Sequence, residues 1–146
     1  MLEYLLSLLP FYESRYVIPI LILKNKGFLE VFFVSMLNLL VYPLVLIFLD
    51  KINMFFIKIK IYRKFYEKVI NYVSKKKKII EKYGYIGLFL LVFLPLPGTG
   101  VYTASILTWL LRLDRKKAIL FISLGVFLLN TSLYVSLKFL RNLFMV

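Results

Sequence analysis

The chain has 146 residues, of which 62% are hydrophobic, and its mean hydropathy is +0.85. A soluble domain is about half apolar and could not cover this much apolar surface, so the composition predicts an integral membrane protein. The chain lacks cysteine and histidine, which excludes disulfides, thiol catalysis, Cys/His zinc sites and imidazole bases. We therefore expect no cofactor, no metal and no enzyme activity. The net charge of +13 is better explained by anionic lipid headgroups than by nucleic acid, because the basic residues cluster beside apolar segments.

The first apolar block covers about residues 4–23 and is interrupted by Pro10, Glu13, Arg15 and Pro19. A secretory signal peptide is the simplest alternative for such a block. It fails here because no basic residue precedes the apolar run and two charges lie in its middle.

Three further apolar blocks follow along the chain. The second, about residues 28–49, is long enough for a helix of about 33 Å and carries no charge beyond Glu30. The third, about residues 83–111, is broken by two prolines and two glycines between Pro95 and Gly100. The fourth, about residues 118–137, is free of charge. The second and fourth blocks predict transmembrane helices.

The basic connector at residues 51–82 separates the second block from the third. It holds eleven lysines and arginines, and its apolar residues repeat at spacings of four and three: Phe55, Ile59, Tyr62, Tyr66, Val69 and Val73. This spacing predicts an amphipathic helix. Its apolar stripe fits the membrane surface or a partner helix, and a solvated cytoplasmic helix fits the pattern equally well.

The basic residues also predict the topology, because cytoplasmic loops are enriched in lysine and arginine. The connector at 51–82 and the next basic cluster at 112–117 both belong on the cytoplasmic side of a cell membrane. A single crossing by the third block would place them on opposite sides. A re-entrant hairpin that turns at its Pro/Gly break keeps both clusters inside, since each arm of about 12 residues is too short to span.

The first block, like the third, is interrupted near its middle. We expect it to form a hairpin at about residues 4–23 that enters the membrane from outside. The fold class is therefore an all-α integral membrane protein, built as an inverted repeat of hairpin plus transmembrane helix. The first repeat covers residues 1–50 and the second covers 83–146, with the basic connector between them. Broken helices in inverted repeats recur in transporters. The alternative is four plain spanning helices with cytoplasmic ends.

Glu13 and Arg15 are the first candidate site. A charge at the bilayer centre costs about 2.5–3.5 kcal/mol on the insertion scale, so two such charges need a protein interior or a wet cavity. Glu13 at low dielectric could bind and release protons, and Arg15 offers a planar donor fork for phosphate or carboxylate. An ion pair that only holds the fold, or a shallow interfacial position, are the alternatives.

The second candidate site is the break in the third block, at Pro95, Pro97, Gly98, Thr99 and Gly100. The prolines stop a helix, and the glycines permit positive φ and close backbone approach. If a half-helix starts after Gly98, Thr99 would cap it and free N–H groups would offer an anion site. A simple tight turn is the alternative.

Four further polar residues lie in the apolar blocks, and interhelical hydrogen bonding is their expected role: Asn38, Tyr102, Thr103 and Asn130.

Two stretches resemble a known family. Residues 11–19 contain the pattern Glu13-Ser14-Arg15 followed by Ile18-Pro19, and residues 83–88 are followed by the run at 95–102. These patterns resemble the putative small multidrug export proteins, a family similar to the DedA/VTT superfamily. The resemblance implies paired re-entrant hairpins of inverted topology. It also implies that Glu13, Arg15, Pro19 and the residues of the second break form the site, and that lipid-linked phosphates or small drugs are exported.

These observations together predict a small, proton-coupled transporter of an anionic, lipid-phosphate or drug substrate. The alternative is an uncoupled lipid scramblase or a structural membrane protein. The expected partners are the bilayer with its anionic headgroups and the substrate, and a homodimer would thicken the wall around a cavity.

Overall fold

The computed structural model describes residues 13–52, 58–94 and 99–144, and within these ranges the chain is helical, without strands. The two longest helices are α3 (Phe28–Ile47) and α9 (Arg115–Phe144). Both are long and apolar enough to cross a membrane, and they correspond to the second and fourth apolar blocks of the sequence. The all-helical class and the two long apolar helices are therefore confirmed.

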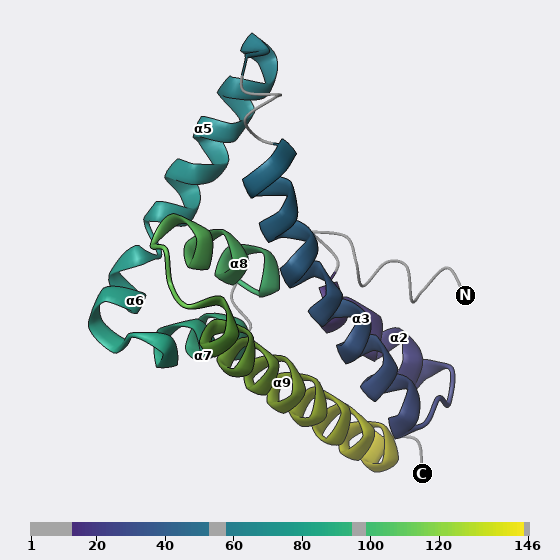
Figure 1. Ribbon diagram of the computed structural model, residues 1–146. Helices are drawn as coiled ribbons and strands as arrows, with labels where there is room; N and C mark the ends of the chain where they lie inside the picture. Colours follow the sequence, from purple (N-terminus) through teal and green to yellow (C-terminus); the bar gives the residue numbers. More distant parts are fainter. Residues whose placement is uncertain (1–12, 53–57, 95–98, 145–146) are drawn as a thin grey trace.

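Helices α3 and α9 lie antiparallel (Figure 1). The ring of Phe28, at the start of α3, meets that of Tyr134 near the far end of α9, with centroids 5.7 Å apart. At the opposite end α3 continues into the short π-helix η1 (Phe48–Ile52), where Asp50 contacts Arg115 at the start of α9. The end of α3 and the beginning of α9 therefore occupy one end of the molecule.

The outward faces of these two helices are apolar. Leu120, Leu124 and Leu128 follow one another at four-residue spacing along α9, and each is more than half exposed. Leu40 and Leu44 form a matching exposed row on α3. Side chains of this kind at this spacing are typical of a helix surface that faces lipid.

Helix α9 begins three residues before the predicted start of the fourth block. The side chain of Asp114 explains this extension, because its Oδ1 accepts hydrogen bonds from the backbone N–H groups of Lys116 and Lys117, at 2.9 and 3.2 Å. An aspartate in this position satisfies the free donors of the first helical turn and favours the helix start. Hydropathy alone could not locate this boundary, since the capping residue is charged.

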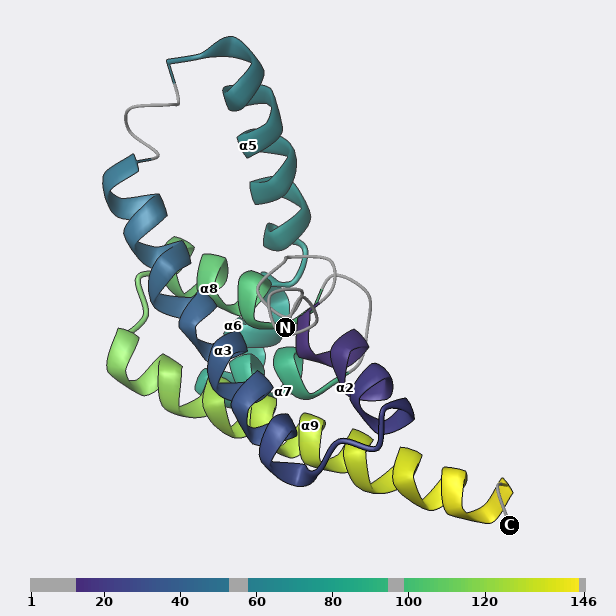
Figure 2. The same cartoon turned by 90° about the vertical axis from the view of Figure 1, so that its right-hand side faces the viewer.

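Three shorter helices pack against the long pair: α2 (Glu13–Leu23), α7 (Tyr85–Phe93) and α8 (Val101–Leu110). At 9 to 11 residues, each is about 14–17 Å long, roughly half the thickness of a bilayer core. Figure 2 shows α2 beside the outer part of α9 and α8 across α3.

Helix α2 runs from the middle of the long pair to one end. Its first turn contacts the middle of α9, where Ser14 bonds to Asn130. Its last turn lies beside the C-terminal part of α9, where Arg141 Nη1 donates to the Ile22 carbonyl at 2.6 Å. The part of the first predicted hairpin at residues 4–12 lies outside the described residues.

The start of α7 lies near the end of α8. The backbone N–H of Asp114, which follows α8, donates to the hydroxyl of Tyr85 at the start of α7, over 3.1 Å. The ring of Tyr85 also stacks on Phe121 of α9, with centroids 5.9 Å apart. The chain between residues 85 and 114 therefore leaves one end of α9 and returns to it. The predicted break in this segment falls between α7 and α8.

The basic connector contains two helices, α5 (Lys60–Ser74) and α6 (Lys77–Tyr83). The apolar stripe of α5 faces α3 and α8, and Val73 is its most buried member. Tyr62 of this stripe lies 6.5 Å from Phe48, measured between ring centroids. The predicted amphipathic helix is therefore present and packs on partner helices. Phe55, which the stripe also included, lies outside the described residues.

Glycine 125 allows the closest approach between α7 and α9. A Cβ atom added to Gly125 would lie 3.0 Å from the Phe89 carbonyl oxygen and 3.0 Å from Val92 Cβ. Small residues at such positions let helix backbones pack closely, which supports association where the surrounding lipid gives no hydrophobic drive.

We expect Gly125→Ala to lower the thermal unfolding temperature of the detergent-purified protein. Overpacking costs about 1–3 kcal/mol, which outweighs the gain of about 1 kcal/mol in helix propensity. Gly27→Ala is the control, because its added Cβ would meet only the side chain of Glu30, at 3.4 Å. An unchanged or raised unfolding temperature for Gly125→Ala would contradict the tight α7–α9 contact.

Candidate functional site

A buried polar cluster joins the first turn of α2 to the middle of α3 and α9. Ser14 Oγ donates to Asn130 Oδ1 at 3.0 Å, and Asn130 Nδ2 donates to Ser35 Oγ at 2.8 Å. Ser35 Oγ in turn donates to the Val31 carbonyl at 2.8 Å. Ser14, Ser35 and Asn130 are at most 3% exposed. We call these three residues the polar centre.

Asn130 uses both ends of its amide in this cluster, as acceptor from α2 and as donor to α3. Asn38, one turn further along α3 than Ser35, is also buried. The sequence predicted interhelical hydrogen bonding for both asparagines, and Asn130 makes it. No sequence pattern indicated that Ser14 and Ser35 are the partners of Asn130, since they lie 116 and 95 residues away from it.

Glu13 and Arg15 flank Ser14 in the first turn of α2. Their side chains lie outside the described part of the structure. The backbone places both residues at the half-helix end that reaches the polar centre. Pro19 lies inside α2, one turn later, and is half-buried.

Thr99 is not the N-cap residue of α8, contrary to the prediction. The residue before the helix is Gly100, which has no side chain to cap the first turn. Thr99 Oγ1 instead donates to the Leu94 carbonyl at 2.9 Å, which links the two sides of the break between α7 and α8. Gly100 has a φ of 142°, a conformation that glycine adopts readily and other residues avoid. Pro95, Pro97 and Gly98 lie outside the described residues.

Helix α8 starts close to the same part of α3 as helix α2. Val101, the first residue of α8, belongs to one buried cluster with Val41, which lies one turn after Asn38. Figures 1 and 2 both show the starts of α2 and α8 beside the middle of α3. Two helix N-termini, one from each half of the chain, therefore approach the centre of the long helix pair. Tyr102 lines an apolar cavity that contains no residue of the polar centre.

A second polar cluster, which the sequence reading missed, joins the end of α3 to the start of α9. Arg115 Nη1 and Nη2 donate to the two carboxylate oxygens of Asp50 at 2.7 and 3.1 Å, and Trp109 Nε1 donates to Asp50 Oδ1 at 3.0 Å. Tyr42 Oη also donates to the Arg115 carbonyl at 3.0 Å. The sequence feature that could have indicated this cluster is Asp50, a single acidic residue at the end of an apolar block and beside the basic connector.

A cavity of about 530 Å³ adjoins this ion pair and is lined by Asp50, Arg112 and Arg115, among others. The described residues hold no cluster of three or more acidic side chains suited to a metal ion.

Comparison with known proteins identifies one family. Residues 13–131 match the family model described as "Putative small multi-drug export protein". No curated protein and no solved structure matches the chain. The similarity to the DedA/VTT superfamily stays a prediction.

We expect Asn130→Leu to destabilise the protein in detergent by about 1–2 kcal/mol. The substitution keeps a similar volume but removes both hydrogen bonds and leaves Ser14 and Ser35 without that partner. Thermal unfolding measures the effect. Asn142→Leu is the matched control, since Asn142 is an exposed asparagine of the same helix. Equal stability of the two variants would contradict a structural role for the polar centre.

Proposed function

The chain belongs to the family of putative small multi-drug export proteins, and we propose that it is a small membrane transporter with its substrate path beside the polar centre. Family membership and two apolar helices of spanning length support the membrane location and the transport class. The observation that carries the location of the path is the start of α2 at the polar centre, midway along α3 and α9.

In this proposal, α2 is a half-helix of the kind that transporters use to bind a substrate at the membrane midplane. A half-helix that starts inside the membrane directs its free N–H groups and positive dipole end toward the bilayer centre. Glu13 and Arg15 belong to that first turn. In the proposal, Glu13 binds and releases the coupling proton, and Arg15 contacts an anionic group of the substrate.

The start of α8 supplies the opposite side of the path in this proposal. Gly100 is the residue before α8 and has no side chain to cap the first turn of the helix. In the proposal, the backbone N–H groups at this helix start contact the same anionic group. Residues 85–110 would then be a re-entrant hairpin, with its tip at the midplane.

The inverted repeat follows from the same assignment. The first hairpin would enter from outside and the second from the cytoplasm, and the connector at 51–82 would lie on the cytoplasmic side of the cell membrane. Proximity of Asp50 to Arg115 supports this arrangement, since it brings the connector and the basic residues at 112–117 to one end. Such paired hairpins are also the arrangement implied by the resemblance to the DedA/VTT superfamily.

The substrate in this proposal is an anionic amphiphile, such as a lipid-linked phosphate or an anionic drug, and its export is coupled to protons. An uncoupled scramblase is the competing function. The two differ in whether flux depends on a proton gradient, and in whether Glu13 matters.

We expect Glu13→Gln to reduce proton-driven flux to the background rate of protein-free liposomes, because the amide cannot titrate. The probe is fluorescent phosphatidate, with ethidium as a cationic comparison, and flux is measured with and without a pH gradient. Glu30→Gln is the control, since Glu30 lies at the start of α3 beside Lys26. Unchanged flux in Glu13→Gln would exclude its role, and flux that ignores the gradient would favour the scramblase.

Single cysteines introduced at Ser14, Thr99, Lys76 and Lys116 test the topology, since the native chain has no cysteine. We expect Lys76→Cys and Lys116→Cys to react with a membrane-impermeant maleimide from the cytoplasmic side only. Ser14→Cys and Thr99→Cys should react slowly, because both positions are buried. Labelling of positions 76 and 116 from opposite sides would eliminate the re-entrant hairpin at 85–110.

A further inference from the structure

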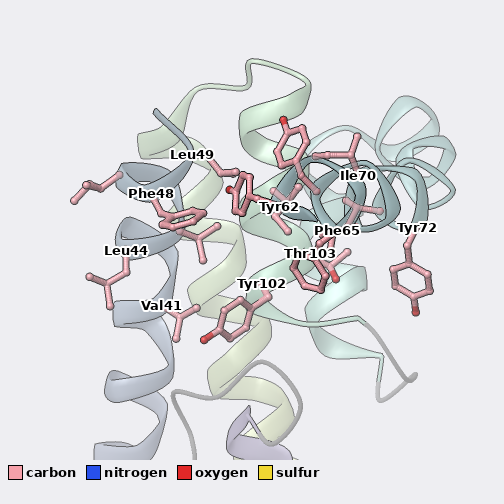
Figure 3. Close-up of a pocket in the computed structure, with 16 residues that line it drawn as sticks. Val41, Leu44, Phe48, Leu49, Tyr62, Phe65, Ile70, Tyr72, Tyr102 and Thr103 are labelled. Atoms are coloured by element: carbon pink, nitrogen blue, oxygen red, sulfur yellow. The ribbon is translucent and has the colours of Figure 1, made fainter. Parts of the chain in front are cut away.

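An apolar cavity of about 750 Å³ lies between α3, α5 and α8 (Figure 3). Its walls include aromatic side chains from η1, α5 and α8, among them Phe48, Tyr62, Phe65 and Tyr102. It shares no residue with the polar centre. Its size and lining are typical of a site for a small hydrophobic ligand. We call it the α3–α5–α8 pocket.

The pocket opens to the surface that α3 presents to lipid. Leu44 of α3 and Phe48, the first residue of η1, line the pocket and remain 59% and 40% exposed. On α5, Phe65 lines the pocket and is 66% exposed. Ile61, one turn before Phe65, is 83% exposed and extends this apolar row beyond the pocket. The exposed apolar surface is therefore continuous from the span to the amphipathic helix.

The charge beside this row is positive. Lys64 and Lys68 are exposed, and helical geometry places them next to the row formed by Ile61 and Phe65. Within the described ranges neither lysine forms an ion pair, whereas Arg63 is neutralised by Glu67 at 2.9 Å. The pocket lining itself has no charged residue. Burial raises the pKa of the Tyr62 hydroxyl, and nearby Tyr66 adds to this effect.

The apolar lining of the pocket and the positive charge beside it together indicate which hydrophobic ligand would bind. The aromatic rings could attract a lipophilic cation, but the neighbouring lysines repel it and the lining offers no carboxylate to compensate. An amphiphile with an apolar chain and an anionic head satisfies both features. In a membrane protein, the bilayer itself supplies that ligand at high concentration.

We propose that the α3–α5–α8 pocket binds an acyl chain of an anionic phospholipid, whose phosphate lies against Lys64 and Lys68 on α5. The bound lipid would hold α5 at the membrane surface, beside the end of α3. This site is separate from the proposed substrate path and does not depend on transport.

Native mass spectrometry of the delipidated, full-length protein tests the proposal. The probes are phosphatidylglycerol and phosphatidylcholine with the same palmitoyl and oleoyl chains. We expect tighter binding of phosphatidylglycerol, and we expect each of Lys64→Gln and Lys68→Gln to weaken that binding about fivefold. Lys78→Gln is the charge control, since it removes an exposed lysine of the same connector away from the pocket. Equal affinity for the two lipids would overturn the role of the lysines.

Filling the pocket is the second arm of the test. Ile106→Trp should abolish the tightest lipid adduct, whereas Leu120→Trp, at an exposed position on α9, should leave it unchanged. Leu44→Trp at the exposed rim provides a second filling variant that leaves the core intact, should Ile106→Trp fail to fold. Retention of the adduct in the filled variants would overturn the proposal, as would a lipid-free dimer with the pocket covered by a second copy.

Discussion

An asparagine in the middle of an apolar helix needs both a donor and an acceptor, because neither lipid nor the aliphatic side chains around it can supply them. Asn130 finds its partners on two different helices, Ser14 of α2 and Ser35 of α3. Their positions fix where α2 starts relative to the long pair. The position of the start of α2 relative to α3 and α9, on which the proposed transport path depends, is therefore set by one amide group and two hydroxyl groups.

The ion pair at the end of α3 has a complementary effect. Asp50 accepts two hydrogen bonds from Arg115 and one from Trp109, so a single carboxylate joins the end of α3, the end of α8 and the start of α9. Exposed pairs of this kind contribute only about 0.2–1 kcal/mol, and their geometry matters more than their energy. The polar centre and this pair hold α3 and α9 together at two levels, and the apolar surfaces between them remain available to lipid.

The sequence predicted the features that depend on local pattern. Long apolar runs gave the two long helices, spacing gave the stripe on α5, and prolines and glycines placed the break between α7 and α8. It did not predict features that depend on contacts between distant residues. Ser14, Ser35 and Asp50 are ordinary in sequence, and only their partners 116, 95 and 65 residues away give them a role. Thr99 was assigned to a cap because the position of Gly100 as the residue before α8 could not be inferred from composition.

The distribution of charge is consistent with the two proposals, a polar substrate path and a separate lipid site. Lysines on the exposed face of α5 lie at one end of the long pair, whereas the polar centre has neutral hydroxyl and amide groups at its middle. An anionic amphiphile would therefore meet positive charge first at the membrane surface, where solvation makes the charge inexpensive. Deeper in the membrane it would meet uncharged donors and two helix N-termini. In the proposed path, positive charge that decreases from the membrane surface toward the midplane would favour the entry of anions over cations. Glu13 and Arg15 would then be the charged groups at the midplane.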